Sequence, residues 1–158
     1  MGRGWHFAID EPAAMKLIDA SGDRPRFREL RLEIEEAADS DVHDSDKAWE
    51  ALHRTFSNGT FDVIDGDPLT HCFFGERILS EDGQFVAMLT PSNVAVVAGL
   101  LSTVTEVWLR ARYFSMQFPD YKQGQDEDDF AYTWACFQGL PEFFARARAA
   151  GRYVIFVT

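Results

Sequence analysis

Cysteine is scarce in this sequence, and long apolar runs are missing. The two cysteines, Cys72 and Cys136, lie 64 positions apart, each among apolar neighbours. A small thiol in such surroundings is typical of a core residue, so we expect both cysteines to be reduced. No window approaches the ~20 apolar residues of a membrane-spanning helix, and the first residues lack the apolar stretch of a signal peptide. We therefore expect a cytoplasmic protein without a membrane segment.

Basic residues are also few. Fifteen lysines and arginines stand against 26 aspartates and glutamates, which gives a formal net charge of −11 and a pI near 4.7. The resulting negative potential repels phosphate backbones and anionic membrane surfaces, so neither nucleic acid nor a membrane is expected as a partner. It would speed encounter with a basic protein, although the same charge also keeps an ordinary protein in solution.

Motifs for metals, nucleotides and covalent catalysis are missing as well. The histidines are His6, His43, His53 and His71. No two of them have the three- or four-residue spacing of a helical metal site, and no cysteine pair accompanies them. No Gly-x-Ser-x-Gly, Gly-x-Gly-x-x-Gly or phosphate-loop pattern occurs. We therefore expect no metal and no cofactor.

The acidic segment 39–46 partly matches a calcium-binding loop. Asp39, Asp41 and Glu50 occupy positions one, three and twelve of such a loop. However, His43 stands at position five, and Asp44 stands at position six, where the sharp turn requires glycine. A solvated acidic connector is therefore the better interpretation.

The chain has enough apolar material for one domain with its own core. Its 158 residues are 46% hydrophobic and 14% aromatic, and they contain no internal repeat or low-complexity linker. We expect a single domain over residues 1–158. The strand and helix patterns together predict a small mixed sheet with the C-terminal strand at its centre, packed by several amphipathic helices.

In the first half of the chain, the patterns predict one strand and three helices. Residues 5–9 are aromatic and partly β-branched, which favours a strand, and Asp10-Glu11-Pro12 is a start signal for a helix to Ala20. A second helix is expected from Arg24, with its arginines and glutamates facing water, and a third from about Ser45 to Gly59. The segment 61–82 is expected to be irregular, with a turn at 65–68 and a short helix or strand at 69–74.

In the second half, residues 84–89 favour a strand, and Thr90-Pro91 marks the start of a helix to about residue 103. Another helix is expected from 105 to 113. The stretch 130–150 has a helical pattern but contains Pro141, which predicts a kink or two helices. Residues 152–158 are almost all apolar, as in a central strand with both faces covered.

Several segments occur in the same order as in a known family. They are Asp46-Lys47-Ala48-Trp49 with Leu52-His53, Pro68-Leu69, Leu89-Thr90-Pro91, Leu109-Arg110-Ala111-Arg112-Tyr113, and Gly151 before the last strand. In their order and spacing, the chain resembles the YfbM-like family of bacterial proteins of unknown function over most of its length. The resemblance implies a single α+β domain, and it implies no catalytic residue, substrate or cofactor. Pro141 and the acidic connector depart from the family pattern.

One constellation on the third helix could support catalysis. Asp46, Glu50 and His53 are four and then three residues apart, which brings their side chains toward one edge of a helix. His53 could act as a general base oriented by a carboxylate, because such a neighbour raises the basicity of imidazole. No nucleophile lies nearby, and a lone histidine on a helix is more often part of the core. A small hydrolase that uses His53 is therefore the alternative hypothesis.

Aromatic and acidic residues together favour a binding function. Aromatic anchors dominate interface energetics, and a group of them precedes the acidic run 126–129. The candidate binding residues are Trp49, Asp41, Asp44, Tyr113, Tyr121 and Asp128. Packing of these rings against the sheet is the competing interpretation. The favoured hypothesis is a non-catalytic acidic binding protein, immunity-like or antitoxin-like, whose partner is a basic protein.

Overall fold

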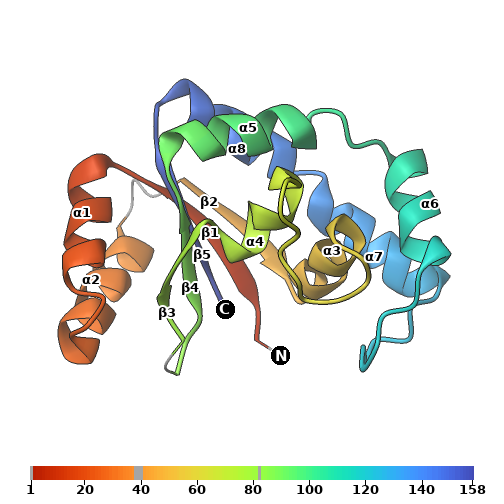
Figure 1. Ribbon diagram of the computed structural model, residues 1–158, viewed down its shortest axis with the longest axis horizontal. Coiled ribbons are helices and arrows are strands. Elements are labelled where there is room, and N and C mark those ends of the chain that lie inside the picture. Colours follow the sequence, from red (N-terminus) through yellow and green to blue (C-terminus); the bar gives the residue numbers. More distant parts are fainter. Residues whose placement is uncertain (1, 38–40, 82) are drawn as a thin grey trace.

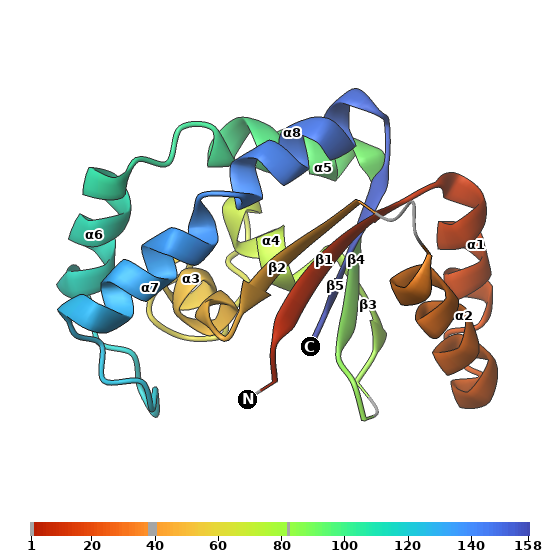
Figure 2. The ribbon, with the colours of Figure 1, turned by 180° about the vertical axis from the view of Figure 1, so that it is seen from behind.

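The protein has one five-stranded sheet with helices on both faces (Figure 1, and Figure 2 from behind). A computed structural model describes residues 2–37, 41–81 and 83–158. The strands are β1 (Gly4–Ile9), β2 (Asp41–Asp46), β3 (Arg77–Ser80), β4 (Val86–Leu89) and β5 (Tyr153–Val157). The helices are α1 (Glu11–Asp19), α2 (Arg24–Glu36), α3 (Ala48–Phe56), α4 (His71–Phe74), α5 (Pro91–Leu101), α6 (Glu106–Ser115), α7 (Glu127–Phe137), α8 (Leu140–Ala149) and the 3₁₀ helix η1 (Pro68–Thr70).

The strand order is β2-β1-β5-β4-β3, so the C-terminal strand lies at the centre of the sheet, as predicted. β5 pairs with β1 on one side and with β4 on the other, and Ile155 stands opposite both Phe7 and Met88. All four strand pairs are antiparallel, which corrects the expectation of a mixed sheet. An apolar run alone shows that both faces of a strand are covered, but it does not show the direction of its neighbours.

The sheet separates two hydrophobic cores, because successive side chains of a strand point to opposite faces. Ile155 and Val157 face the smaller core, which α1 and α2 cover and to which α2 contributes Phe27. Val154 and Phe156 face the larger core, which is formed with α3 to α8. Figure 1 shows α1 and α2 on one side of the sheet and the remaining helices on the other. The fold is therefore a helix–sheet–helix sandwich of unequal layers.

The helix boundaries follow local signals where such signals exist. The Asp10 carboxylate caps α1 by accepting a hydrogen bond from the Ala13 N–H at 2.9 Å, and Asp23 caps α2 in the same way. Pro141 lies in the first turn of α8, where its missing N–H leaves no hydrogen bond unmade. The stretch 130–150 is therefore divided into α7 and α8, which confirms the prediction of two helices.

Three local expectations are corrected by the structure. Residues 41–46 form the edge strand β2 instead of a connector; Asp39 lies outside the described residues. Residues 69–74, expected to be a short helix or a strand, are helical in η1 and α4, but β3 forms where an irregular segment was expected. The side chain of Arg31 on α2 was expected to face water, but the residue is only 8% exposed. Charged residues are common on edge strands because they discourage further strand pairing, which accounts for the composition of β2.

No single helix of the described residues has both the length and the hydropathy to cross a membrane. α5 and α6 meet that criterion only when they are joined across a 93° bend. α5 packs into the larger core, where Val94, Val97 and Leu101 are buried. Both cysteines are free thiols, and Cys72 is buried in the same core.

Two histidines lie fully inside the larger core. His6 on β1 contacts the rings of Phe73 and Phe156, with centroids 5.1 and 4.9 Å away, and its Nε2 donates a hydrogen bond to the Cys72 carbonyl at 2.8 Å. Burial lowers the pKa of His6 to about 3. His53 on α3 is also fully buried, and burial lowers its pKa to about 4. Both imidazoles are therefore neutral in the folded protein at neutral pH.

These two histidines predict a loss of stability in mild acid. Imidazole in the unfolded chain takes up a proton below about pH 6.5, whereas His6 and His53 take one up only near pH 3 and 4, so acid favours the unfolded state. We expect the free energy of unfolding to be fully retained above pH 6.5 and to fall by up to about 1.4 kcal/mol per pH unit for each histidine as the pH decreases toward 5. Urea titrations of the wild type and of His53→Leu at several pH values measure this slope. The variant should show a smaller slope, and an equal slope in both proteins would contradict the assignment.

A second prediction concerns the turn after α4. Gly75 has φ +60°, and a Cβ atom there would lie 2.7 Å from the backbone N and O of Met88. Gly66 has φ +80°, but its Cβ would meet nothing within 4 Å. We expect Gly66→Ala to cost about 1–2 kcal/mol of unfolding free energy from backbone conformation alone, and Gly75→Ala to cost at least ~1 kcal/mol more because the β4 backbone must move. Urea unfolding of both variants tests this difference, and similar losses would argue against the close approach of Gly75 to β4.

Candidate interaction surface

The end of the molecule away from α1 and α2 is built by α6 and α7 (Figure 1). α6 begins after Thr105, whose hydroxyl accepts a hydrogen bond from the Trp108 N–H at 3.1 Å. Leu109 and Tyr113, four residues apart, are the buried residues of α6. The ring of Tyr113 meets that of Phe130 on α7 edge-on, with 5.3 Å between the centroids. One face of α6 is thus anchored in the larger core, and the opposite face is exposed.

The exposed side of α6 carries apolar residues. Val107 is 79% exposed and Phe114 is 41% exposed. Ala111 is also exposed and lies four residues after Val107 and three before Phe114, so the three side chains share one face of the helix. We call these three residues the α6 face. Trp108 borders it with 37% exposure. Neighbouring exposed apolar side chains of this kind are typical of interaction sites.

An arginine joins this exposed side of α6 to α7. Arg110 forms an ion pair with Glu127. Its guanidinium also lies 5.1 Å from the centre of the Phe114 ring and 5.2 Å from that of Phe130. The cation–π contact and the ion pair together restrict the Phe114 ring and the angle between the two helices. The helix that carries the α6 face is therefore held against α7 by Arg110.

The first turn of α7 places carboxylates beside the α6 face. Asp126 caps the helix by accepting a hydrogen bond from the Asp129 N–H at 2.9 Å, and Glu127 pairs with Arg110. Asp128 is exposed, and it makes no ion pair or side-chain hydrogen bond within the residues that the structure describes. Negative charge is favourable at this position because the N-terminus of a helix carries partial positive charge. Asp128 is thus an exposed side chain that a partner could contact.

The two predicted tyrosines have an internal role. The hydroxyls of Tyr113 and Tyr121 both donate to the Asp129 carboxylate, in the case of Tyr121 at 2.8 Å. Burial, and then the hydrogen bond to Asp129, raise the pKa of both phenols far above the usual value. Gln125 donates from Nε2 to the carbonyls of Tyr113 and Met116, both at 2.7 Å. These bonds tie the loop between α6 and α7 to both helices, so neither phenol is offered to a ligand.

The other predicted binding residues are also occupied within the fold. Asp41 binds Arg146 of α8 at 2.9 and 3.1 Å, and Asp44 pairs with Arg3. Trp49 is 3% exposed, and its Nε1 donates to a backbone carbonyl at 3.1 Å. Of the six candidate binding residues, only Asp128 combines exposure with the absence of a partner among the described residues.

The structure does not bring the catalytic candidates together. His53 is enclosed by aromatic rings, including Phe74 at 4.1 Å between centroids, and neither ring nitrogen makes a well-formed hydrogen bond within the described residues. Glu50 is bound to Arg54 at 3.0 Å, and Asp46 to Arg3 at 3.1 Å. Two surface cavities of about 800 and 560 Å³ are lined by none of the three candidates. His53 therefore lacks both the partner and the access that a general base needs.

No group of three or more metal-ligating side chains is found in residues 2–37, 41–81 and 83–158.

The main feature that sequence reasoning missed is Val107. Its position two residues before Leu109 places it outside the buried stripe of Leu109 and Tyr113, which was a usable signal.

Comparison with known proteins places this surface on a fold that has been seen before. The sequence matches a family model described as a domain of unknown function, DUF1877, over residues 1–157. The structure is similar to the crystal structure of YfbM from Escherichia coli, a protein of unknown function, with a TM-score of 0.73 and 20% sequence identity. The similarity covers 98% of each chain. No curated protein matches the sequence.

The family match and the shared fold confirm the resemblance seen in the sequence segments. Because YfbM is itself a protein of unknown function, the comparison establishes the fold and leaves the activity open. The chain belongs to the DUF1877 family, the family of unknown function whose model spans residues 1–157.

Proposed function

We propose that this protein is a non-catalytic binding protein that docks a basic protein partner on α6 and the first turn of α7. The observation that carries the proposal is the 79% exposure of Val107 on a helix whose other side is anchored in the core. Exposed valine is unremarkable alone, but here it shares a face with Ala111 and Phe114. Covering such side chains provides the apolar part of an interface.

The charge around the α6 face specifies the partner's chemistry. Asp128 is exposed in the first turn of α7 and has no partner among the described residues, and the chain as a whole carries a net charge of −11. A basic partner would be attracted over a distance, and a lysine or arginine at the edge of its interface could pair with Asp128. An immunity-like or antitoxin-like role toward a basic protein is the concrete form of this proposal.

The rigidity of the site supports a binding role. Arg110 holds the Phe114 ring in place through a cation–π contact. Asp129 holds Tyr113 and Tyr121 by accepting hydrogen bonds from both hydroxyls. A surface that is already ordered loses little conformational entropy when a partner binds. By contrast, the hydrolase hypothesis finds no comparable support, because His53 is buried among aromatic rings.

The test compares two valines that differ mainly in their location. Wild type, Val107→Asp and Val96→Asp are immobilised, and a lysate of the organism that encodes the protein is applied at low and high ionic strength; any retained protein is identified, purified and titrated by calorimetry. We expect a basic partner that is retained at low salt and released by salt, with about tenfold weaker binding to Val107→Asp. Val96 on α5 is 44% exposed, away from the α6 face, so its variant should bind like the wild type.

Two outcomes count against the proposal. One is a partner that binds Val107→Asp as tightly as it binds the wild type. The other is the absence of any salt-sensitive basic partner in repeated captures. Circular dichroism of both variants establishes that a loss of binding does not come from unfolding.

A further inference from the structure

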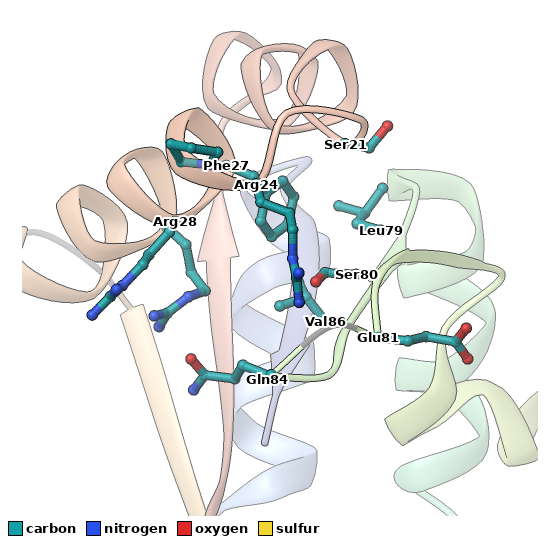
Figure 3. A pocket seen from close by; sticks show the side chains of 12 residues that line it. Ser21, Arg24, Phe27, Arg28, Leu79, Ser80, Glu81, Gln84 and Val86 are labelled. Atoms are coloured by element: carbon teal, nitrogen blue, oxygen red, sulfur yellow. The ribbon is translucent and has the colours of Figure 1, made fainter.

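A cavity of about 800 Å³ lies between α2 and the β3–β4 hairpin, on the side of the sheet opposite to the α6 face (Figure 3). Its volume is within the range of small-molecule sites. Its apolar lining comes from Phe27, Leu79 and Val86, which are at most 6% exposed and belong to the smaller core. The cavity therefore rests on the rigid, packed part of the fold.

Arginine dominates the polar lining of this cavity. Arg24, Arg28 and Arg31 all line it, and Glu81 is the carboxylate among the lining residues that the structure describes. The spacing of four and then three residues places the arginines on one face of α2. Figure 3 shows the side chains of Arg24 and Arg28 extending in the same direction from α2 and the Glu81 carboxylate turned away from them. In a chain of net charge −11, these three side chains bring positive charge to the wall of the cavity.

Arg31 has hydrogen-bonding capacity that the described residues do not use. It is 8% exposed and pairs with Glu35 through one guanidinium nitrogen. A guanidinium has five N–H donors, and the remaining donors make no hydrogen bond within the described residues. Arg31 is one of the residues that line the cavity, which brings these donors to its wall. An oxyanion in the cavity would satisfy them.

Arg28 adds an exposed positive charge to the lining of the cavity. It is exposed, and it forms no ion pair with any residue in the described parts of the chain. The first turn of α2 contains no acidic residue, and its last turn contains no basic one, which is the reverse of the arrangement that a helix macrodipole favours. The arginines therefore add to the partial positive charge of the helix start, where the Asp23 cap offsets it in part. This distribution is unfavourable for the helix and favourable for an anion.

We propose that this cavity binds a small organic anion, whose phosphate or carboxylate group contacts Arg28 and Arg31 and whose apolar part packs on Phe27, Leu79 and Val86. Arginine suits both groups because its planar fork can donate two parallel hydrogen bonds. Gln84 on the hairpin side supplies an amide that can bind a further polar group of the ligand. The net charge of −11 repels polyanions, so the occupant is a small molecule and not a nucleic acid.

The test uses defined probes and two matched variants. Phenyl phosphate and benzoate each combine an aromatic ring with one anionic group. Inorganic phosphate has the negative charge without a ring, and phenol has the ring without a charge at neutral pH. Each is titrated into ¹⁵N-labelled protein while amide shifts are recorded. We expect saturable shifts at residues 24–31 and 79–86 with phenyl phosphate, benzoate or both, and weaker or no binding of phenol and inorganic phosphate. The stronger of the two ring anions identifies the preferred group.

Arg28→Gln should weaken binding of the better ring anion by about tenfold, because it removes charge-assisted hydrogen bonds. Arg26→Gln removes the same charge from an exposed position of the same helix that does not line the cavity, so it should bind like the wild type. Equal weakening in both variants would reduce the effect to general electrostatics and overturn the proposal. The same holds if neither ring anion gives saturable shifts, or if the shifts map outside these two segments. Unchanged amide positions elsewhere in the variant spectra establish that the fold is intact.

Discussion

The pairing of the C-terminal strand β5 with both β1 and β4 is the interaction on which the rest of the structure depends. It joins the first and last segments of the chain at the centre of the sheet. Because its side chains alternate between the faces, β5 contributes Ile155 and Val157 to one core and Val154 and Phe156 to the other. The positions of α2 over one face and of α3 to α8 over the other follow from this strand. The locations of the cavity beside α2 and of the α6 face follow from it as well.

The parts of the fold that sequence reasoning predicted are those with a local cause. The apolar run of β5, the Asp10 cap of α1 and the proline in the first turn of α8 each act through residues within a few positions of one another. β2 was missed because its apolar character is low. It exists because the free edge of β1 pairs with it, and that pairing joins residues about 40 positions apart. β3 was missed for a similar reason, since its four residues pair with β4 and leave little periodicity to detect.

The candidate sites were harder to predict because the role of a polar side chain depends on its partner. Asp41 reads as a free acidic residue until Arg146, 105 positions away, is found beside it. Tyr113 and Tyr121 read as loop aromatics until both hydroxyls converge on Asp129. His53 reads as a possible base until Phe74 and its neighbours enclose it. In each case the residue type was correctly noticed, and the tertiary contact that decides its function lay outside the sequence pattern. Conversely, Arg31 was placed in solvent by helical periodicity, whereas in the folded protein it is only 8% exposed and lines the cavity beside the β3–β4 hairpin.

The two proposed binding surfaces lie in different layers of the fold. The arginines of α2 lie beside the smaller core, and Asp128 lies on α7, which packs on the larger core at the other end of the molecule (Figure 1). The two surfaces share no side chain, and the packed sheet stands between them. Substitutions at sites that are well separated and have no common partner usually have additive effects. Changes at Val107 and at Arg28 should therefore act independently, so a variant that altered both kinds of binding would indicate a global change in the fold instead of the loss of one site.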